Sequence, residues 1–280
     1  MGYPIGRPAM KMILLHIHDD RGADGRLQAA CDIARACNAH VRCVQVTPMP
    51  SLMAADVYGG AGYAPSIAAE LHEIADGFRH RVEAHLAHED VAWDWVQMDG
   101  DSVAGLLAAA HLADLIVASL PEHGRATMQD PLPIVADLAL GGRTPVLAVP
   151  ATARSLPIAG RAMVAWDGSE QSCAALRAAV PLLRLADHVD IVTVEEGGGT
   201  DFPATGAPEY LARHGVKARL HSWAKGDHPV ECALREAIDT LGADWMVMGA
   251  FGHGRWRERI FGGVSHAMLR TARVPLLLAH

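Results

Sequence analysis

The chain has 280 residues, of which 50% are apolar and 20% charged, a length for one large or two ordinary domains and a composition that excludes a disordered protein. Its formal net charge of −8 excludes a general nucleic-acid binder, because neutralising phosphates needs a Lys/Arg surplus. The longest apolar stretch, 103–120, contains His111 and Asp114 and does not read as a membrane span. We therefore expect a cytoplasmic protein with neither nucleic-acid nor membrane partners.

Short apolar runs alternate with helical patterns along the whole chain. Runs that are apolar on both faces and are separated by helices predict parallel sheets covered on both sides. A Pro/Gly/Ala-rich segment, 47–66, predicts a loop or flap, and apolar spacing near 3.6 predicts a helix at 67–89. The strands are predicted at 12–17, 41–46, 93–98, 115–120, 146–150, 162–166, 190–194, 218–223, 245–249 and 276–279.

The chain repeats itself. Residues 161–194 parallel 11–46, and a constant offset carries Asp167 onto Asp19 and Val194 onto Val46. Residues 226–249 parallel 100–119. A repeat of this length predicts two copies of one unit. We expect an α/β fold of two tandem, doubly wound, five-stranded Rossmann-like domains, 1–150 and 151–280, joined by the loop 151–160.

Five cysteines stand in the chain without a C-x-x-C pair, which favours buried, reduced thiols. His16 and His18 form an H-x-H on a predicted strand, but no third ligand is visible, so we expect no metal site.

Five glycines lie in "GAFGHGRWRERIFGGVSH", 249–266, between a predicted strand and a predicted helix. Glycines let the backbone approach a ligand, and successive N–H groups together with a helix N-terminus favour an oxyanion. Ligands of doubly wound sheets sit at the carboxyl ends of strands, where Asp167 ends the first strand of the second copy. This pattern predicts a phosphate chain in the loop and the base or sugar of a nucleotide near Asp167.

These residues resemble the tandem-domain universal stress proteins, within the adenine nucleotide alpha-hydrolase-like superfamily, from Lys11 to His280. The resemblance implies a G-x2-G-x9-G loop that binds ATP, with the aspartate reading adenine, the valine beside the base, and the Val-Ser pair facing phosphate. His253 lies within the loop. The implied contacts are Asp167, Val194, Met248, Gly249, Gly252, His253, Gly262, Gly263, Val264 and Ser265.

Two departures limit what the resemblance implies. Gly263 stands where the family has Ser or Thr, and a lost hydrogen bond to a charged group costs roughly 1.5–3 kcal/mol, which leaves ATP, ADP and AMP open. The first copy has Ser119, Glu122 and Leu132 in place of the glycines, followed by Pro133. A carboxylate and a proline there should reject phosphate, so we expect the first copy not to bind a nucleotide.

Other functions remain open. The glycines could be ordinary turn residues, with the protein a scaffold for protein partners or another small ligand. A slow ATPase would need Mg²⁺ and a group that positions water; Asp227 and Glu231 are candidates, but no nucleophile–base pair shows, so we name no catalytic residue. The family's single-domain members pair through their last strands, which implies an internal pseudo-dimer and leaves a further homodimer open.

Overall fold

The computed structural model describes residues 10–48, 64–121, 127, 129–195, 205–252 and 263–280. The first half contains β1 (Met12–Ile17), α1 (Ala23–Cys37), β2 (His40–Thr47), α2 (Ala64–Leu86), β3 (Ala92–Asp99), α3 (Ser102–Ala109), the 3₁₀ turn η2 (Ala110–Leu112), β4 (Leu115–Leu120), α4 (Val135–Gly141) and β5 (Val146–Pro150). The second contains β6 (Arg161–Ala165), α5 (Glu170–Leu183), β7 (His188–Glu195), α6 (Gly206–Arg213), β8 (Ala218–Ala224), α7 (Val230–Leu241), β9 (Trp245–Gly249), α8 (Gly263–Thr271) and β10 (Leu276–Ala279).

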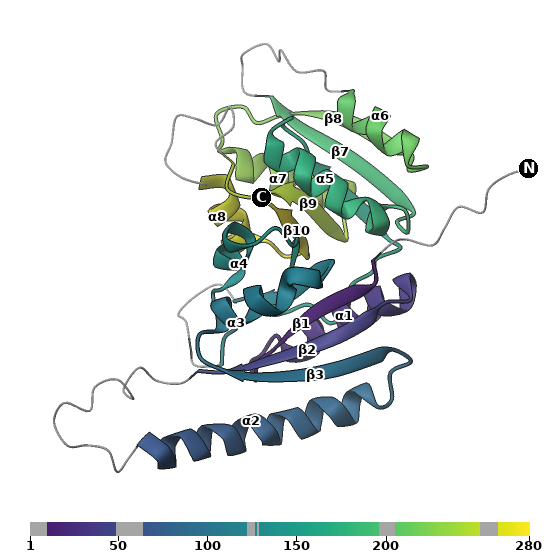
Figure 1. Ribbon diagram of the computed structural model, residues 1–280. Helices are drawn as coiled ribbons and strands as arrows, with labels where there is room; N and C mark the ends of the chain where they lie inside the picture. The colour runs from purple at the N-terminus through teal and green to yellow at the C-terminus, as the bar shows by residue number, and fades with distance from the viewer. Residues whose placement is uncertain (1–9, 49–63, 122–126, 128, 196–204, 253–262) are drawn as a thin grey trace, which may run out of the picture.

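All these strands form one sheet, in the order β3-β2-β1-β4-β5-β10-β9-β6-β7-β8. Neighbours within each half are parallel, whereas the last strands of the two halves, β5 and β10, pair antiparallel with Leu147 opposite Leu277. The two five-stranded halves therefore sit side by side (Figure 1). The predicted α/β fold and the internal pseudo-dimer are confirmed.

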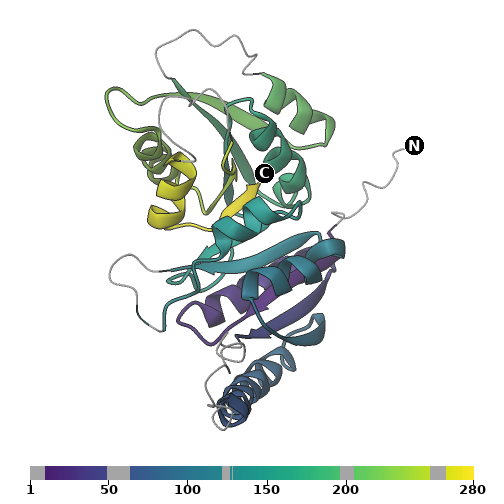
Figure 2. The same cartoon turned by 60° about the vertical axis from the view of Figure 1, so that its left-hand side comes forward.

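Helices cover both faces of this sheet (Figures 1 and 2). One core contains buried side chains of α1, α2, α5 and α6, and the other those of α3, α4, α7 and α8. The central strands are buried on both faces, with the β4 run fully buried, because each packs against helices above and below. The edge strands β3 and β8 are partly exposed. None of the helices in the described ranges is long and apolar enough to cross a membrane.

Short polar residues fix where the helices begin. Asp101 caps α3, its carboxylate accepting the Ala104 N–H at 2.8 Å. Ser169 caps α5, its hydroxyl accepting the Ser172 N–H at 3.1 Å. These side chains satisfy amides that lack a partner within the helix.

The strand register corrects the sequence alignment of the two first strands by one residue. Ile13 pairs with Leu115, and Ala162 holds the equivalent place opposite Trp245. His18, and not Asp19, is therefore the counterpart of Asp167. The prediction failed because it used one constant offset, whereas the segment from Met12 to its partner His40 is one residue longer than that from Arg161 to His188. Because side chains alternate between faces, this shift moves each residue to the other face of the sheet.

The cysteines are free, and three of the five are buried. Burial raises the pKa of Cys31 to about 12 and of Cys37 to about 11. The pKa of Cys43 is raised as well, chiefly by burial. These thiols are held in the unreactive protonated form, which fits the expectation of reduced core cysteines.

Candidate functional site

The candidate site lies in the second half of the sheet, at the point where the order of the strands changes direction. β6 has β7 on one side and β9 on the other, so the carboxyl end of β6 is a topological switch point, the usual place for a ligand in this class of sheet. Asp167 follows β6, Val194 lies near the end of β7, and Gly249 ends β9. The fold brings these three predicted residues to one edge.

Asp167 belongs to the turn that leads into α5. It is half-buried, and its Oδ1 accepts the Ser169 N–H at 3.0 Å. Gly168 between them has a φ of 74°, which glycine adopts without steric cost. Ser169, rather than Asp167, is the helix cap. The aspartate is thus held at the carboxyl end of β6 by a local turn.

Packing requires a glycine at 249, whereas at Gly252 a Cβ would meet only the end of a flexible side chain. A Cβ on Gly249 would lie 2.5 Å from the backbone nitrogen of Ser172, so β9 and the first turn of α5 touch directly. A Cβ on Gly252 would lie 2.8 Å from the Gln171 side-chain oxygen. The reading of these glycines as structural is therefore correct in part, and the same closeness brings the backbone after β9 next to the start of α5.

The loop begins with a residue that the sequence did not indicate. Phe251 has a φ of 54°, a left-handed conformation that is an outlier for a bulky side chain. Its N–H donates to Ser265 Oγ at 3.0 Å, and its ring meets His266 edge-on at 5.0 Å between centroids. Ser265 is buried. A backbone strained in this way carries no sequence signature, which is why Phe251 was missed.

The end of the C-terminal strand, β10, forms hydrogen bonds with the start of the same loop. The Ala250 N–H donates to the Ala279 carbonyl at 2.8 Å. The His280 ring nitrogen Nδ1 lies 2.9 Å from the Ala250 carbonyl and donates to it. His280 was not predicted to act here, since it joins the loop only through the pairing of β9 with β10.

The other predicted contacts divide into three groups. Met248 is buried in the core, and Val264 is half-buried in α8. Gly263 is exposed at the start of α8, with open space where a Cβ would be. His253 and Gly262 lie outside the described residues.

The equivalent edge of the first half is filled by its own side chains. Ser119 replaces Gly249, and its Oγ accepts from Arg26 Nη1 at 2.7 Å. Arg26 is almost fully buried and pairs with Asp20 at 3.1 Å. Its Nη2 also donates to the His18 carbonyl at 2.9 Å. A charged side chain buried in this way needs such partners. This network was not predicted, because an arginine near the start of a helix reads as a solvated residue.

Two histidines complete the filled edge. The rings of His16 and His18 stack at 5.8 Å, and His16 replaces the small Ala165 of the second half. His18 Nδ1 contacts Asp20 at 3.1 Å. Burial, together with the charges of Arg26 and His18, lowers the pKa of His16 well below its usual value. No group of three or more metal-binding side chains occurs in the parts of the chain that the structure describes.

The carboxylate of Asp20 stays ionised in this network. Burial raises its pKa, but the hydrogen bond from His18 and the charges of Arg26 and His18 outweigh burial, and the net pKa is lowered. The first half therefore holds a paired cation and anion at the place where the second half has Gly249 packed against the start of α5.

Part of the second half is similar in sequence to a known family. Residues 209–280 match the model of the Universal stress protein family. None of the curated proteins matches the chain.

Structural comparison extends over both halves. A universal stress protein from Archaeoglobus fulgidus DSM 4304 matches with a TM-score of 0.71 and 16% identity, covering 97% of this chain and 98% of that one. A protein assigned to the universal stress proteins from Pseudomonas aeruginosa UCBPP-PA14 matches with a TM-score of 0.56 and 17% identity, covering 97% and 94%.

A single-domain universal stress protein solved in complex with cAMP covers 43% of this chain and 97% of its own, with 19% identity and a TM-score of 0.33. Residues 209–280 are similar in sequence to the Universal stress protein family, and the chain as a whole shares the fold of the two solved structures that match 97% of its length.

Proposed function

We propose that the protein is a stress-response regulator that binds one adenine nucleotide, ATP, ADP or AMP, at the carboxyl edge of the second half. The observation that supports this most is the convergence of Asp167, Val194, Gly249 and the first turn of α8 at the switch point. In this proposal Asp167 and Val194 contact the base.

The phosphates would lie over the backbone from Gly249 to Gly252 and the start of α8, where helix N–H groups and the positive end of the helix dipole favour an anion. Ser265 positions this loop through Phe251. His253, Gly262, Gly263 and Val264 complete the proposed phosphate contacts, and Mg²⁺ would accompany the phosphates.

The domain boundaries that accompany this proposal are 1–150 and 151–280. β5 ends at Pro150 and β6 begins at Arg161. The connecting segment is packed rather than free, since Leu156 is buried and its N–H donates to Asp32 at 3.0 Å. We propose that the first half binds no nucleotide at its own switch point and serves as a scaffold, because Arg26 and His16 occupy that position. A cytoplasmic location and regulation through protein partners belong to the same proposal.

Calorimetric titration with ATP tests the site. We expect wild type to bind and Asp167→Asn, which keeps an acceptor for the Ser169 N–H, to bind at least ten-fold more weakly. Asp19→Asn is the matched control, since Asp19 is an exposed carboxylate paired with Arg81, and it should bind as wild type does. Equal binding by Asp167→Asn would overturn the assignment of Asp167, and no binding by wild type would favour the scaffold function.

A further inference from the structure

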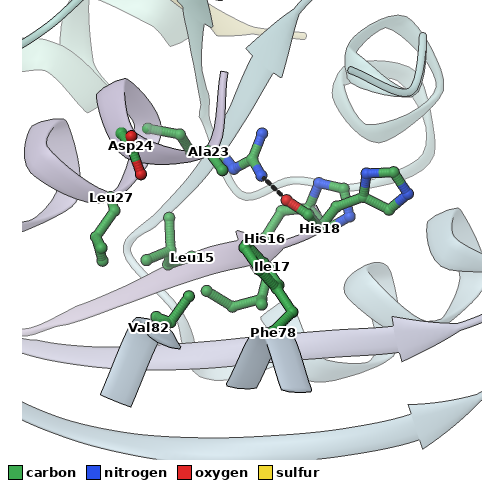
Figure 3. Close-up of a pocket in the computed structure, with 10 residues that line it drawn as sticks. Leu15, His16, Ile17, His18, Ala23, Asp24, Leu27, Phe78 and Val82 are labelled. Atoms are coloured by element: carbon green, nitrogen blue, oxygen red, sulfur yellow. Dashed lines mark hydrogen bonds between the residues drawn. The ribbon is translucent and has the colours of Figure 1, made fainter. Parts of the chain in front are cut away.

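The helix α2 has one buried side and one exposed side. It lies at the outside of the first half, away from the second half (Figures 1 and 2). Its buried side carries Phe78 and Val82, which line a small cavity together with Leu15 (Figure 3). On its exposed side, Ile74 is 59% exposed. A single exposed apolar residue is common, so the side chains around Ile74 decide whether it marks an interface.

The charges of α2 are divided between its two halves. The first half of the helix contains Glu70, Glu73 and Asp76, all exposed, and neither lysine nor arginine. Arg79 and Arg81 follow in the second half. The first turn of α2 contains no acidic residue, and the helix dipole acts only within the terminal turns. The dipole therefore does not account for this division of charge.

Part of this charge is left for an outside partner. Arg79 is paired with Glu83 of the same helix at 2.7 Å. Arg81 contacts Asp19 and lies over the Phe78 ring, 5.1 Å from its centroid, yet its side chain is 63% exposed. A guanidinium has five N–H donors, so Arg81 can bind a second carboxylate. The three carboxylates of the acidic half form no ion pair with any side chain in the described ranges.

Glu70, Ile74 and Arg81 share one face of α2. Their spacings of four and eleven residues are close to one and three whole turns. Glu70 follows Ala64, the first residue of α2, by six positions, and Arg81 precedes the last residue, Leu86, by five. A second α2, antiparallel to the first about a two-fold axis, would thus place each Glu70 opposite the other helix's Arg81. The two Ile74 side chains would lie near the axis.

We propose that this face of α2, defined by Glu70, Ile74 and Arg81, is the surface through which two copies of the chain associate, with their α2 helices antiparallel. A two-fold contact requires a surface that is complementary to itself, and the divided charge of α2 meets this requirement twice. The net charge of −8 opposes association where opposite charges do not meet. An interface limited to one helix pair is small, so the dimer is weak and reversible.

Sedimentation equilibrium of the full chain over a series of concentrations tests the proposal. We expect a reversible monomer–dimer equilibrium in wild type. Glu70→Lys and Arg81→Glu, measured separately, should each weaken dimerisation roughly ten-fold or more, since like charges then meet at both symmetric contacts. An equimolar mixture of the two variants should recover the wild-type affinity, because opposite charges again face each other at both contacts.

A matched pair of variants tests the apolar centre of the surface. Ile74→Gln keeps a good helix former and should weaken dimerisation at least three-fold. Leu112→Gln is the control and should associate as wild type does. Leu112 is 90% exposed and lies in η2, whose core is on the other face of the sheet from that of α2. Circular dichroism should show wild-type folding for all these variants, because each changes an exposed side chain.

Three results would overturn the proposal. The first is a wild type that stays monomeric at every concentration. The second is a mixture of Glu70→Lys and Arg81→Glu that associates no better than either variant alone. The third is equal association by Ile74→Gln and Leu112→Gln. The ATP titration is independent of these results.

Discussion

The two halves differ most at the place where they correspond most closely, the carboxyl edge of the central strands. In the first half, Arg26 occupies the crevice and binds the hydroxyl of Ser119. In the second, Gly249 replaces Ser119, and the backbone of β9 comes against the start of α5. One topology thus supports two solutions, an internal ion pair in the first half or close backbone packing at a glycine in the second. In our proposal, the local side chains, and not the fold, determine whether a ligand can bind.

The largest effect should follow from breaking the internal ion pair. Arg26→Met leaves the buried carboxylate of Asp20 without its cation, and removal of one partner of a buried pair costs about 3–5 kcal/mol. Urea denaturation should show this loss. The double variant Arg26→Met/Asp20→Asn should recover most of it, because no unpaired charge remains. A loss below about 1 kcal/mol in the single variant would show that the pair is not buried as described.

Adding a side chain at Gly249, at the carboxyl edge of the second half, should have the next largest effect on stability. Gly249→Ala places a Cβ 2.5 Å from the Ser172 backbone nitrogen, and such overpacking typically costs about 1–3 kcal/mol. We expect lower stability and weaker ATP binding together. Ser119→Gly in the first half is the comparison, and it should not create a second nucleotide site while Arg26 remains. Unchanged stability in Gly249→Ala would contradict the close contact.

Supplying a missing hydroxyl should strengthen the site by a smaller amount. Gly263→Ser adds a donor where nothing lies within 4 Å of the new Cβ. One hydrogen bond to a charged group is worth roughly 1.5–3 kcal/mol, so ATP affinity measured by calorimetry should rise about ten-fold or more. Gly77→Ser, at an exposed glycine of α2 with open space where a Cβ would be, controls for a general effect of added serine. Weaker ATP binding by Gly263→Ser would place the phosphates elsewhere.

The smallest effect concerns pH. Because the pKa of His16 is lowered well below 6.5, the unfolded state binds a proton that the folded state does not, and stability falls as pH drops below about 6.5. One such group contributes at most about 1.4 kcal/mol per pH unit. His16→Ala, which copies Ala165, should flatten the profile of unfolding free energy between pH 6.5 and 5. The lowered pKa of Asp20 removes further stability only below its usual value of 3.8. An unchanged profile would contradict a neutral, buried His16.

The sequence predicted the two-fold repeat and the strands, because apolar runs separated by helices have few other solutions. It placed Asp167, Val194 and Gly249 on one edge, since strand ends in a parallel sheet share that edge. It could not predict the register of the first strands, because the segment between the first and second strands is one residue longer in the first half than in the second. Nor could it reveal the left-handed Phe251 or the buried Arg26, because both depend on neighbours that are distant in the chain.

The most direct test of this asymmetry is the number of adenine nucleotides bound per chain, measured by native mass spectrometry at saturating ATP. We predict one, lost in Asp167→Ala and retained in Asp19→Ala. Two nucleotides per chain would show that the Arg26 network does not close the first half, and none would show that the glycine loop serves packing alone.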